Sequence, residues 1–229
     1  MSYSHAVTIR RFAELLAERV DVGWLTESAL RFTFACALMD VEPFHHYSID
    51  FECALPFHTG SRLDLVATEL GHDHSVVAEF KYHHERLYSV LPCIALAGKL
   101  YRDLFRLAFT EAWWSCAAYL VYLTDEIMAD YLCDPQFGCA SLWQLAPDDQ
   151  LRIGPDSLAG RSKTFRKAIG DFAHYPATVT CVHRDVFTTG HATRELRVFQ
   201  VTHEPDEIYD QYWTWATEIL GIAPSLLKG

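Results

Sequence analysis

The stretch that decides the fold runs from Ser61 to Tyr82 and reads SRLDLVATELGHDHSVVAEFKY. Two apolar runs flank a polar turn, a pattern typical of a β-hairpin. Three charges interrupt the apolar runs: Asp64 in the first, and Glu79 and Lys81 in the second. Because a lone charge is costly to bury, we expect these side chains to have partners, and a metal ion is one candidate.

The register of this hairpin decides whether the three charges meet. Successive strand residues face opposite sides of a sheet, so Glu79 and Lys81 share one face. A turn centred between residues 71 and 72 sets Asp64 opposite Glu79, and a turn centred between residues 72 and 73 sets it opposite Lys81. Either register gathers the three charges on one face, whereas a one-residue slip would scatter them.

Two carboxylates and an ammonium on one sheet face suit metal-assisted hydrolysis of a phosphodiester. Carboxylates bind a hard divalent cation such as Mg2+, for which Mn2+ can substitute. The cation polarises the phosphate and lowers the pKa of a bound water. The ammonium can orient that water or stabilise developing negative charge. We therefore expect Asp64 and Glu79 to bind the metal and Lys81 to act in catalysis.

The spacing of these residues resembles a known signature. Asp64, fourteen intervening residues and Glu79-Phe80-Lys81 are similar to the D…ExK motif of the PD-(D/E)xK, restriction-endonuclease-like nuclease superfamily. The proline of the motif's name is absent, because Leu63 precedes Asp64. The resemblance implies a metal-dependent endonuclease acting on DNA, in restriction, phage defence or repair. It adds the Phe80 carbonyl to the metal ligands Asp64 and Glu79.

The resemblance also implies an α/β fold with an αβββαβ core, a mixed central sheet flanked by helices, and the motif on the second and third strands. Hydrophobic periodicity predicts elements in that order. They are helices at 8–20 and 26–39, strands at 47–55, 61–69 and 75–82, a helix at 87–109, a strand at 115–124 and a helix at 125–132. We expect one nuclease-like domain over residues 1–229, with its core at about 25–130.

The remainder, about residues 134–229, is expected to elaborate this core. The segment 134–160 is rich in Pro and Gly, which predicts a lid or an irregular connection. A hairpin is expected at 177–188 and 193–203 with its turn around Thr189-Gly190, followed by an aromatic-rich helix at 207–220.

A further acidic residue is expected from a helix before the sheet. Glu27 lies in the first turn of the 26–39 helix, where a carboxylate favours the helix dipole. The resemblance offers a second role, because many nucleases of this superfamily extend a glutamate from that helix toward the metal. Glu14 and Glu18 on the first helix are the alternatives.

Basic residues provide the candidate substrate contacts. Lys99, Arg102 and Arg106 recur at three- and four-residue spacing, as a solvated face or a basic stripe. In the resembled fold this helix lies beside the active site, which makes Lys99 and Tyr101 candidates for phosphate contact. The segment RSKTFRK is either a solvated helix start or a phosphate-binding segment. Its candidate residues are Arg161, Lys163, Arg166 and Lys167.

The composition limits which cellular compartment and which binding partners are expected. The net charge of −11 argues against a general nucleic-acid coat protein, although DNA binding needs only a local basic face. No apolar run reaches the length of a membrane span, and no stretch resembles a signal peptide. Seven cysteines without a CxxC pair indicate reduced core thiols and a cytoplasmic location.

Other functions compete with the autonomous nuclease. The fold can be catalytically silent and serve as a binding or scaffold subunit, which the acidic charge and the aromatic 207–220 helix favour. It can also depend on a protein partner for DNA targeting, or act as a homodimer. A zinc site is a weaker alternative, because the histidine pairs lack the HExxH spacing. Those pairs are His45-His46, His72/His74 and His83-His84.

Overall fold

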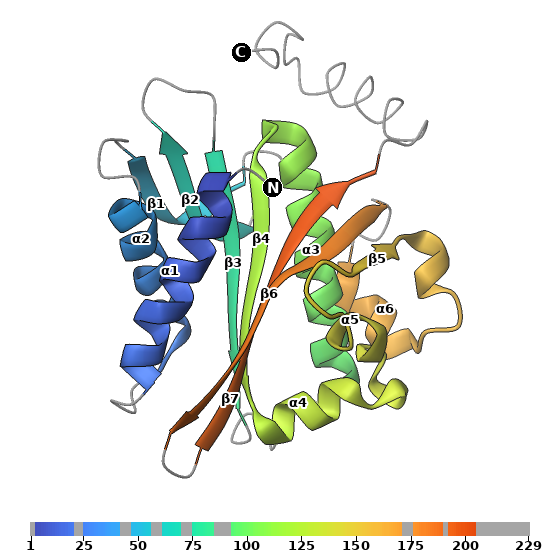
Figure 1. The fold of residues 1–229 in the computed structure, drawn as a ribbon. Helices are drawn as coiled ribbons and strands as arrows, with labels where there is room; N and C mark the ends of the chain where they lie inside the picture. Colours follow the sequence, from blue (N-terminus) through green and yellow to red (C-terminus); the bar gives the residue numbers. More distant parts are fainter. Residues whose placement is uncertain are drawn as a thin grey trace, which may run out of the picture.

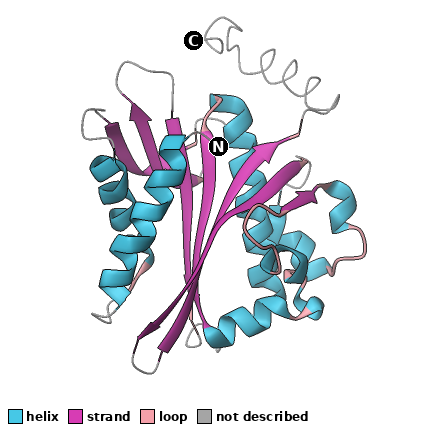
Figure 2. Cartoon of the chain, viewed as in Figure 1, coloured by secondary structure: helices cyan, strands magenta, loops and turns pink. Residues whose placement is uncertain are grey.

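A computed structural model describes residues 3–20, 25–41, 47–55, 61–69, 75–84, 93–170, 176–189 and 192–204. They form a mixed α/β fold in which a seven-stranded sheet is flanked by helices (Figures 1 and 2). The strands are β1 (Tyr47–Ala54), β2 (Arg62–Glu69), β3 (Ser75–His83), β4 (Ala117–Asp125), β5 (Gln150–Ile153), β6 (Ala177–Thr189) and β7 (Ala192–His203). The helices are α1 (Tyr3–Val20), α2 (Glu27–Val41), α3 (Cys93–Trp114), α4 (Glu126–Cys133), η2 (Pro135–Phe137), α5 (Ala140–Trp143), η3 (Pro155–Leu158) and α6 (Lys163–Ile169).

The sheet is ordered β1-β2-β3-β4-β7-β6-β5. β3 and β4 run parallel, which requires a long crossover, and α3 lies in that connection. All other neighbouring strands are antiparallel. β4 lies in the middle of the sheet and is buried from Ala118 to Thr124, as its continuous apolar sequence predicts.

The two faces of the sheet carry separate hydrophobic cores. α1 and α2 cover one face, whose core includes Phe80 and Val121. α3 to α6 lie on the other side, with Val77, Leu120 and Trp143 in the core (Figure 1). Neighbours such as Leu120 and Val121 thus belong to opposite cores, as the two-residue period of a strand requires. By the same period, Glu79 and Lys81 share the face of Val77.

The predicted order of elements is confirmed through α4. α1 begins five residues before the predicted start at residue 8, and α3 continues five residues beyond the predicted end at 109. Residues 87–92 of the predicted 87–109 helix lie outside the described residues, and so does the whole predicted helix at 207–220. Asp125 begins α4 as its N-cap, because its carboxylate accepts a hydrogen bond from the Met128 N–H at 2.9 Å.

The C-terminal part differs in detail from the prediction. The β6–β7 hairpin pairs Thr189 with Ala192, so its turn is centred one residue later than expected. Its register also shifts between Cys181 and His183. The segment 134–160 is more regular than its Pro and Gly content suggests, because it contains η2, α5, β5 and η3.

Two further expectations concern the compartment. Six cysteines are free thiols: Cys36, Cys53, Cys116, Cys133, Cys139 and Cys181. Three of them are buried, but Cys133 is exposed and Cys36 and Cys53 are half-buried, so the expectation that the cysteines are core residues is only partly correct. No helix within the described residues is both long and apolar enough to span a membrane.

Gly98 of α3 lies against Phe165 and Ala168 of α6. A Cβ there would lie 2.5 Å from the Phe165 carbonyl oxygen and 2.7 Å from Ala168 Cβ. We expect Gly98→Ala to lower the free energy of unfolding by roughly 1–2 kcal/mol, because overpacking outweighs the gain in helix propensity. Urea denaturation of the purified variant measures this loss.

Gly154→Ala is the matched control for this substitution. The nearest atom to its added Cβ is Pro176 Cβ at 3.5 Å, and its φ of −176° is extended backbone open to any residue. We expect a change within about 0.5 kcal/mol. A Gly98→Ala protein as stable as the Gly154→Ala protein would contradict the close α3–α6 contact.

Candidate active site

β2 and β3 pair in the first of the two predicted registers. The pairing ends with Leu65 opposite Ala78, and the same register continued by one residue would set Asp64 opposite Glu79. The hairpin is therefore centred between residues 71 and 72, although the turn itself lies outside the described residues. This register directs the two carboxylates toward each other.

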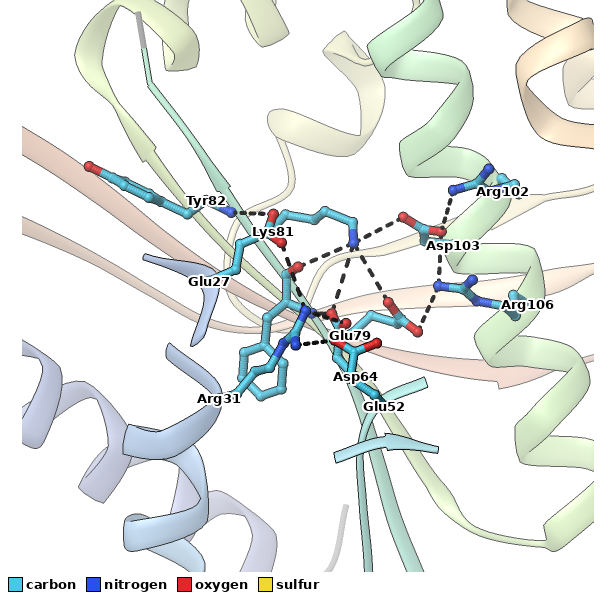
Figure 3. A network of polar contacts seen from close by, with 11 residues as sticks. Glu27, Arg31, Glu52, Asp64, Glu79, Lys81, Tyr82, Arg102, Asp103 and Arg106 are labelled. Carbon is cyan, nitrogen blue, oxygen red and sulfur yellow. Dashed lines mark hydrogen bonds and ion pairs between the residues drawn. The ribbon is translucent and has the colours of Figure 1, made fainter. Parts of the chain in front are cut away.

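The Lys81 ammonium is the centre of a polar network (Figure 3). Its Nζ lies 3.6 Å from Glu79 Oε2 and 4.0 Å from Asp64 Oδ2. It also donates a hydrogen bond to the Phe80 carbonyl at 3.2 Å and lies 3.3 Å from Asp103 Oδ2. Asp64, Glu79 and Lys81 thus meet, as the hairpin geometry predicts. The sequence motif does not include Asp103.

Each of the two motif carboxylates is held by an arginine on its other oxygen. Arg31 of α2 lies 2.7 Å from Asp64 Oδ1, and Arg106 of α3 lies 2.7 Å from Glu79 Oε1. Asp64 Oδ2 additionally accepts a hydrogen bond from the Phe80 N–H at 2.7 Å. Each carboxylate therefore has one oxygen fixed by a guanidinium and the other facing Lys81.

Two glutamates complete the network on the α2 side. Glu52 lies in β1 between the paired residues Phe51 and Cys53, and it pairs with Arg31. Its φ of 54° is uncommon for a residue other than glycine, and such conformations concentrate at functional sites. Glu27 Oε1 accepts a hydrogen bond from the Tyr82 N–H at 3.4 Å, and its Oε2 lies 3.9 Å from Arg31.

The three candidate helix glutamates occupy different places. Glu27 lies at the edge of the network, and burial raises its pKa, although Lys81 opposes that shift. Glu14 instead pairs with Arg11 of α1 at 3.2 Å. Glu18 is exposed on the same helix. Of the three, Glu27 is the one positioned to act with Asp64 and Lys81.

Burial and charge together set the protonation of the network. Glu79 is 1% exposed, and burial raises its pKa to about 8, although Arg106 and Lys81 favour the ionised form. Burial also lowers the pKa of Lys81, but Asp103, Glu79 and Asp64 more than offset this, so the net pKa is raised. Lys81 therefore stays charged at neutral pH, while Glu79 is the group that gains or loses a proton there.

His83 follows Lys81 on the same face of β3. Its Nδ1 lies 2.6 Å from the Tyr122 hydroxyl. Burial, and next the charge of Lys81, lower its pKa to about 4. The imidazole beside the network is therefore neutral at physiological pH.

The donor set suits a hard divalent cation. An ammonium already lies among oxygens of Asp64, Glu79, Asp103 and Phe80, so this position attracts positive charge. Mg2+ is usually held by one or two carboxylates and keeps several waters. Asp64, Glu79 and the Phe80 carbonyl would supply such ligands.

A larger cluster of metal-binding side chains is not found in the described part of the chain. No three His, Cys, Asp or Glu side chains there lie close enough together to hold a metal ion. Four histidines of the zinc alternative lie outside the described residues: His45, His46, His72 and His74.

The residues of the predicted basic stripe on α3 point in different directions. Arg106 is turned inward, 8% exposed and paired with Glu79, so a solvated face does not describe it. Arg102 is partly exposed, and Lys99 is half-buried. Tyr101 is 1% exposed with its ring packed on Phe165, and its expected phosphate contact stays a prediction.

The remaining candidate contacts lie at α6. The guanidinium of Arg161 lies over the Phe165 ring, 5.3 Å from its centroid. Ser162 caps the helix, and the basic side chains beyond it are exposed: Lys163, Arg166 and Lys167. α6 packs on α3, the helix that carries Asp103 and Arg106, but no ion pair within the described residues joins its basic side chains to the network.

Neither family models nor comparisons with curated proteins and solved structures give a match to this chain.

Proposed function

We propose that this chain is a metal-dependent nuclease of the PD-(D/E)xK type that hydrolyses DNA phosphodiester bonds. The observation that carries the proposal is the Lys81 ammonium, 3.6 Å from Glu79 Oε2 and 4.0 Å from Asp64 Oδ2 on adjacent strands. The element order from α2 to β4 supports a restriction-endonuclease-like αβββαβ core over about residues 25–130.

The proposed roles follow from the contacts. Asp64, Glu79 and the Phe80 carbonyl would hold Mg2+ or Mn2+, which when bound polarises phosphate and acidifies a water. Lys81 orients the attacking water or stabilises negative charge on the phosphate. Glu27 lies where it can orient a water at the edge of the site.

Arg31 and Arg106 have a supporting role in this proposal. Each fixes the carboxylate oxygen that faces away from Lys81, which leaves the other oxygen of Asp64 and of Glu79 for the metal. Such outer partners orient metal ligands, and their loss typically reduces metal affinity or activity about 10–100-fold.

Substrate binding in this proposal requires a positively charged surface on an acidic chain. The chain carries a net charge of −11, so DNA contact would depend on a local basic surface such as α6, or on a protein partner or second subunit. The six free cysteines favour a reducing compartment, and we retain the cytoplasm as the proposed location.

DNA cleavage assays test the function directly. We expect the wild-type chain to cut plasmid or linear DNA with Mg2+ or Mn2+, and EDTA to stop it. Asp64→Asn should abolish cutting, because it removes a metal ligand while keeping the side-chain volume. Asp50→Asn, on the exposed side of β1, is the matched control and should cut normally. Equal cutting by the wild-type and Asp64→Asn proteins would refute the proposal.

One observation favours a second function. Arg31 and Arg106 already neutralise Asp64 and Glu79 at 2.7 Å each, as expected of a catalytically silent fold used as a binding or scaffold subunit. Calorimetric titration with Mn2+ separates the two functions. Binding that Asp64→Asn removes supports the nuclease, and no such binding with or without DNA supports the scaffold.

A further inference from the structure

We infer that Asp103 is a positioning residue that draws the Lys81 ammonium off Asp64 and Glu79 when these carboxylates bind a divalent cation. The inference deepens the proposed function and rests on it. It assigns a role to a buried carboxylate outside the D…ExK motif.

Lys81 competes with a metal ion for the proposed metal ligands. Its Nζ lies within 4.0 Å of Asp64 Oδ2, 3.6 Å of Glu79 Oε2 and 3.2 Å of the Phe80 carbonyl oxygen. These are the same oxygens that would bind the metal. Two positive charges cannot share these oxygens without strong repulsion, so metal binding requires the ammonium to shift.

Asp103 provides an alternative carboxylate partner for the Lys81 ammonium. Asp103 lies on α3, so Lys81 Nζ lies between carboxylates of the hairpin and a carboxylate of the helix (Figure 3). Asp103 Oδ2 is 3.3 Å from Nζ and is buried without a hydrogen bond among the described residues. A buried acceptor in that state gains by a closer contact with a donor.

Asp103 is itself held in place by two arginines. Its Oδ1 lies 3.1 Å from Arg106 and 3.4 Å from Arg102, both on the same helix. One oxygen is thus anchored while the other faces Lys81. The lysine has the freedom to move, because its charge sits at the end of a flexible four-carbon stem. A shift toward Asp103 needs only new side-chain torsions.

A purely structural role for Asp103 within α3 would not require its contact with Lys81. Arg106 already has Glu79 at 2.7 Å, so it does not depend on Asp103 for a counter-charge. The contact of Asp103 with Lys81 is the part that a role within α3 leaves unexplained. The inference therefore predicts an effect that depends on the Lys81 ammonium.

A double-mutant cycle on Mn2+ affinity tests this dependence. Calorimetry would be applied to the wild-type, Asp103→Asn, Lys81→Met and double-variant proteins, with thermal melts to confirm folding. We expect Asp103→Asn to weaken Mn2+ binding about tenfold when Lys81 is present, and less than about twofold in the Lys81→Met background. We also expect Lys81→Met alone to bind Mn2+ more tightly than the wild-type protein.

A matched control separates positioning from simple loss of charge. Glu52 carries a nearby negative charge that pairs with Arg31. Glu52→Gln should therefore change Mn2+ affinity by the same factor with or without Lys81. Equal losses from Asp103→Asn in both backgrounds would overturn the inference and leave the proposed function intact.

Two other results of the Mn2+ titrations also bear on the role of Asp103. If Asp103→Asn does not fold, Asp103→Glu replaces it in the cycle. The glutamate keeps the negative charge but moves the carboxylate. A change in Mn2+ affinity that depends on Lys81 is again expected. No Mn2+ binding by the wild-type protein would overturn the proposed function, and the inference with it.

Discussion

Replacing Arg106 with methionine is expected to cost about 3–5 kcal/mol of unfolding free energy at pH 9, because it removes one partner of a buried ion pair. Glu79 is 1% exposed and has Arg106 at 2.7 Å. Methionine fills similar space without a charge, so the loss reports two buried carboxylates, Glu79 and Asp103, that each lose a partner. Urea denaturation at constant ionic strength measures it.

The size of this loss should depend on pH. The pKa of Glu79 is about 8 in the folded protein, against 4.5 ordinarily, so the folded state retains a proton that the unfolded state releases. The stability that this proton provides is complete below pH 4.5 and is lost as pH rises to about 8. Without Arg106 the folded pKa rises further, so the variant continues to lose stability above pH 8. The gap from the wild-type protein should therefore be larger at pH 9 than at pH 6.

The same helix offers a matched control. Arg102 lies 3.4 Å from Asp103 but is 38% exposed, so Arg102→Met should cost less than about 1 kcal/mol. Adding Glu79→Gln to Arg106→Met should recover part of the stability at pH 9, because one of the two buried carboxylates that lost Arg106 is then neutral. Equal losses from Arg102→Met and Arg106→Met would show that the Arg106–Glu79 pair contributes no more than a surface contact.

The hairpin was predictable because local rules determine it. Apolar alternation and a polar turn define the strands, and the two-residue period then decides which charges share a face. These rules are enough to bring together Asp64, Glu79 and Lys81. Predicting the register between β2 and β3 then required only a choice between two equally plausible turns.

The partners from the flanking helices were not predictable in this way. The spacing of Lys99, Arg102 and Arg106 on α3 predicts a basic stripe, and nothing in that spacing indicates that Arg106 turns inward to Glu79. Arg31 follows Glu27 by four residues, a spacing typical of a surface pair, and nothing in the sequence indicates that it reaches Asp64. A usable signal did exist for Asp103, because a carboxylate among the apolar residues of α3 raises the same cost of burial as Asp64 does in its strand.

Lys81→Met is expected to lower kcat for DNA cleavage about 10²–10³-fold, the range found when one preorganised donor to a transition state is removed. Nζ is the one positively charged group of the D…ExK motif, and in the proposed function it stabilises negative charge on the phosphate. Its loss should therefore appear in kcat, and the Mn2+ affinity should not fall. Lys81→Arg should not restore activity, because a planar guanidinium cannot replace a compact ammonium among the oxygens of Asp64, Glu79 and Asp103.

Lys163→Met is the matched control for Lys81→Met. Lys163 is exposed on α6 and is a candidate phosphate contact. Removing one such contact should raise KM a few-fold and reduce the salt dependence of binding, with kcat unchanged. The two lysines are thus expected to separate catalysis from binding in single-turnover and steady-state assays. A Lys81→Met protein whose kcat stays within tenfold of the wild-type value would exclude Lys81 from the chemical step, because its ammonium would then be serving only to neutralise buried carboxylates.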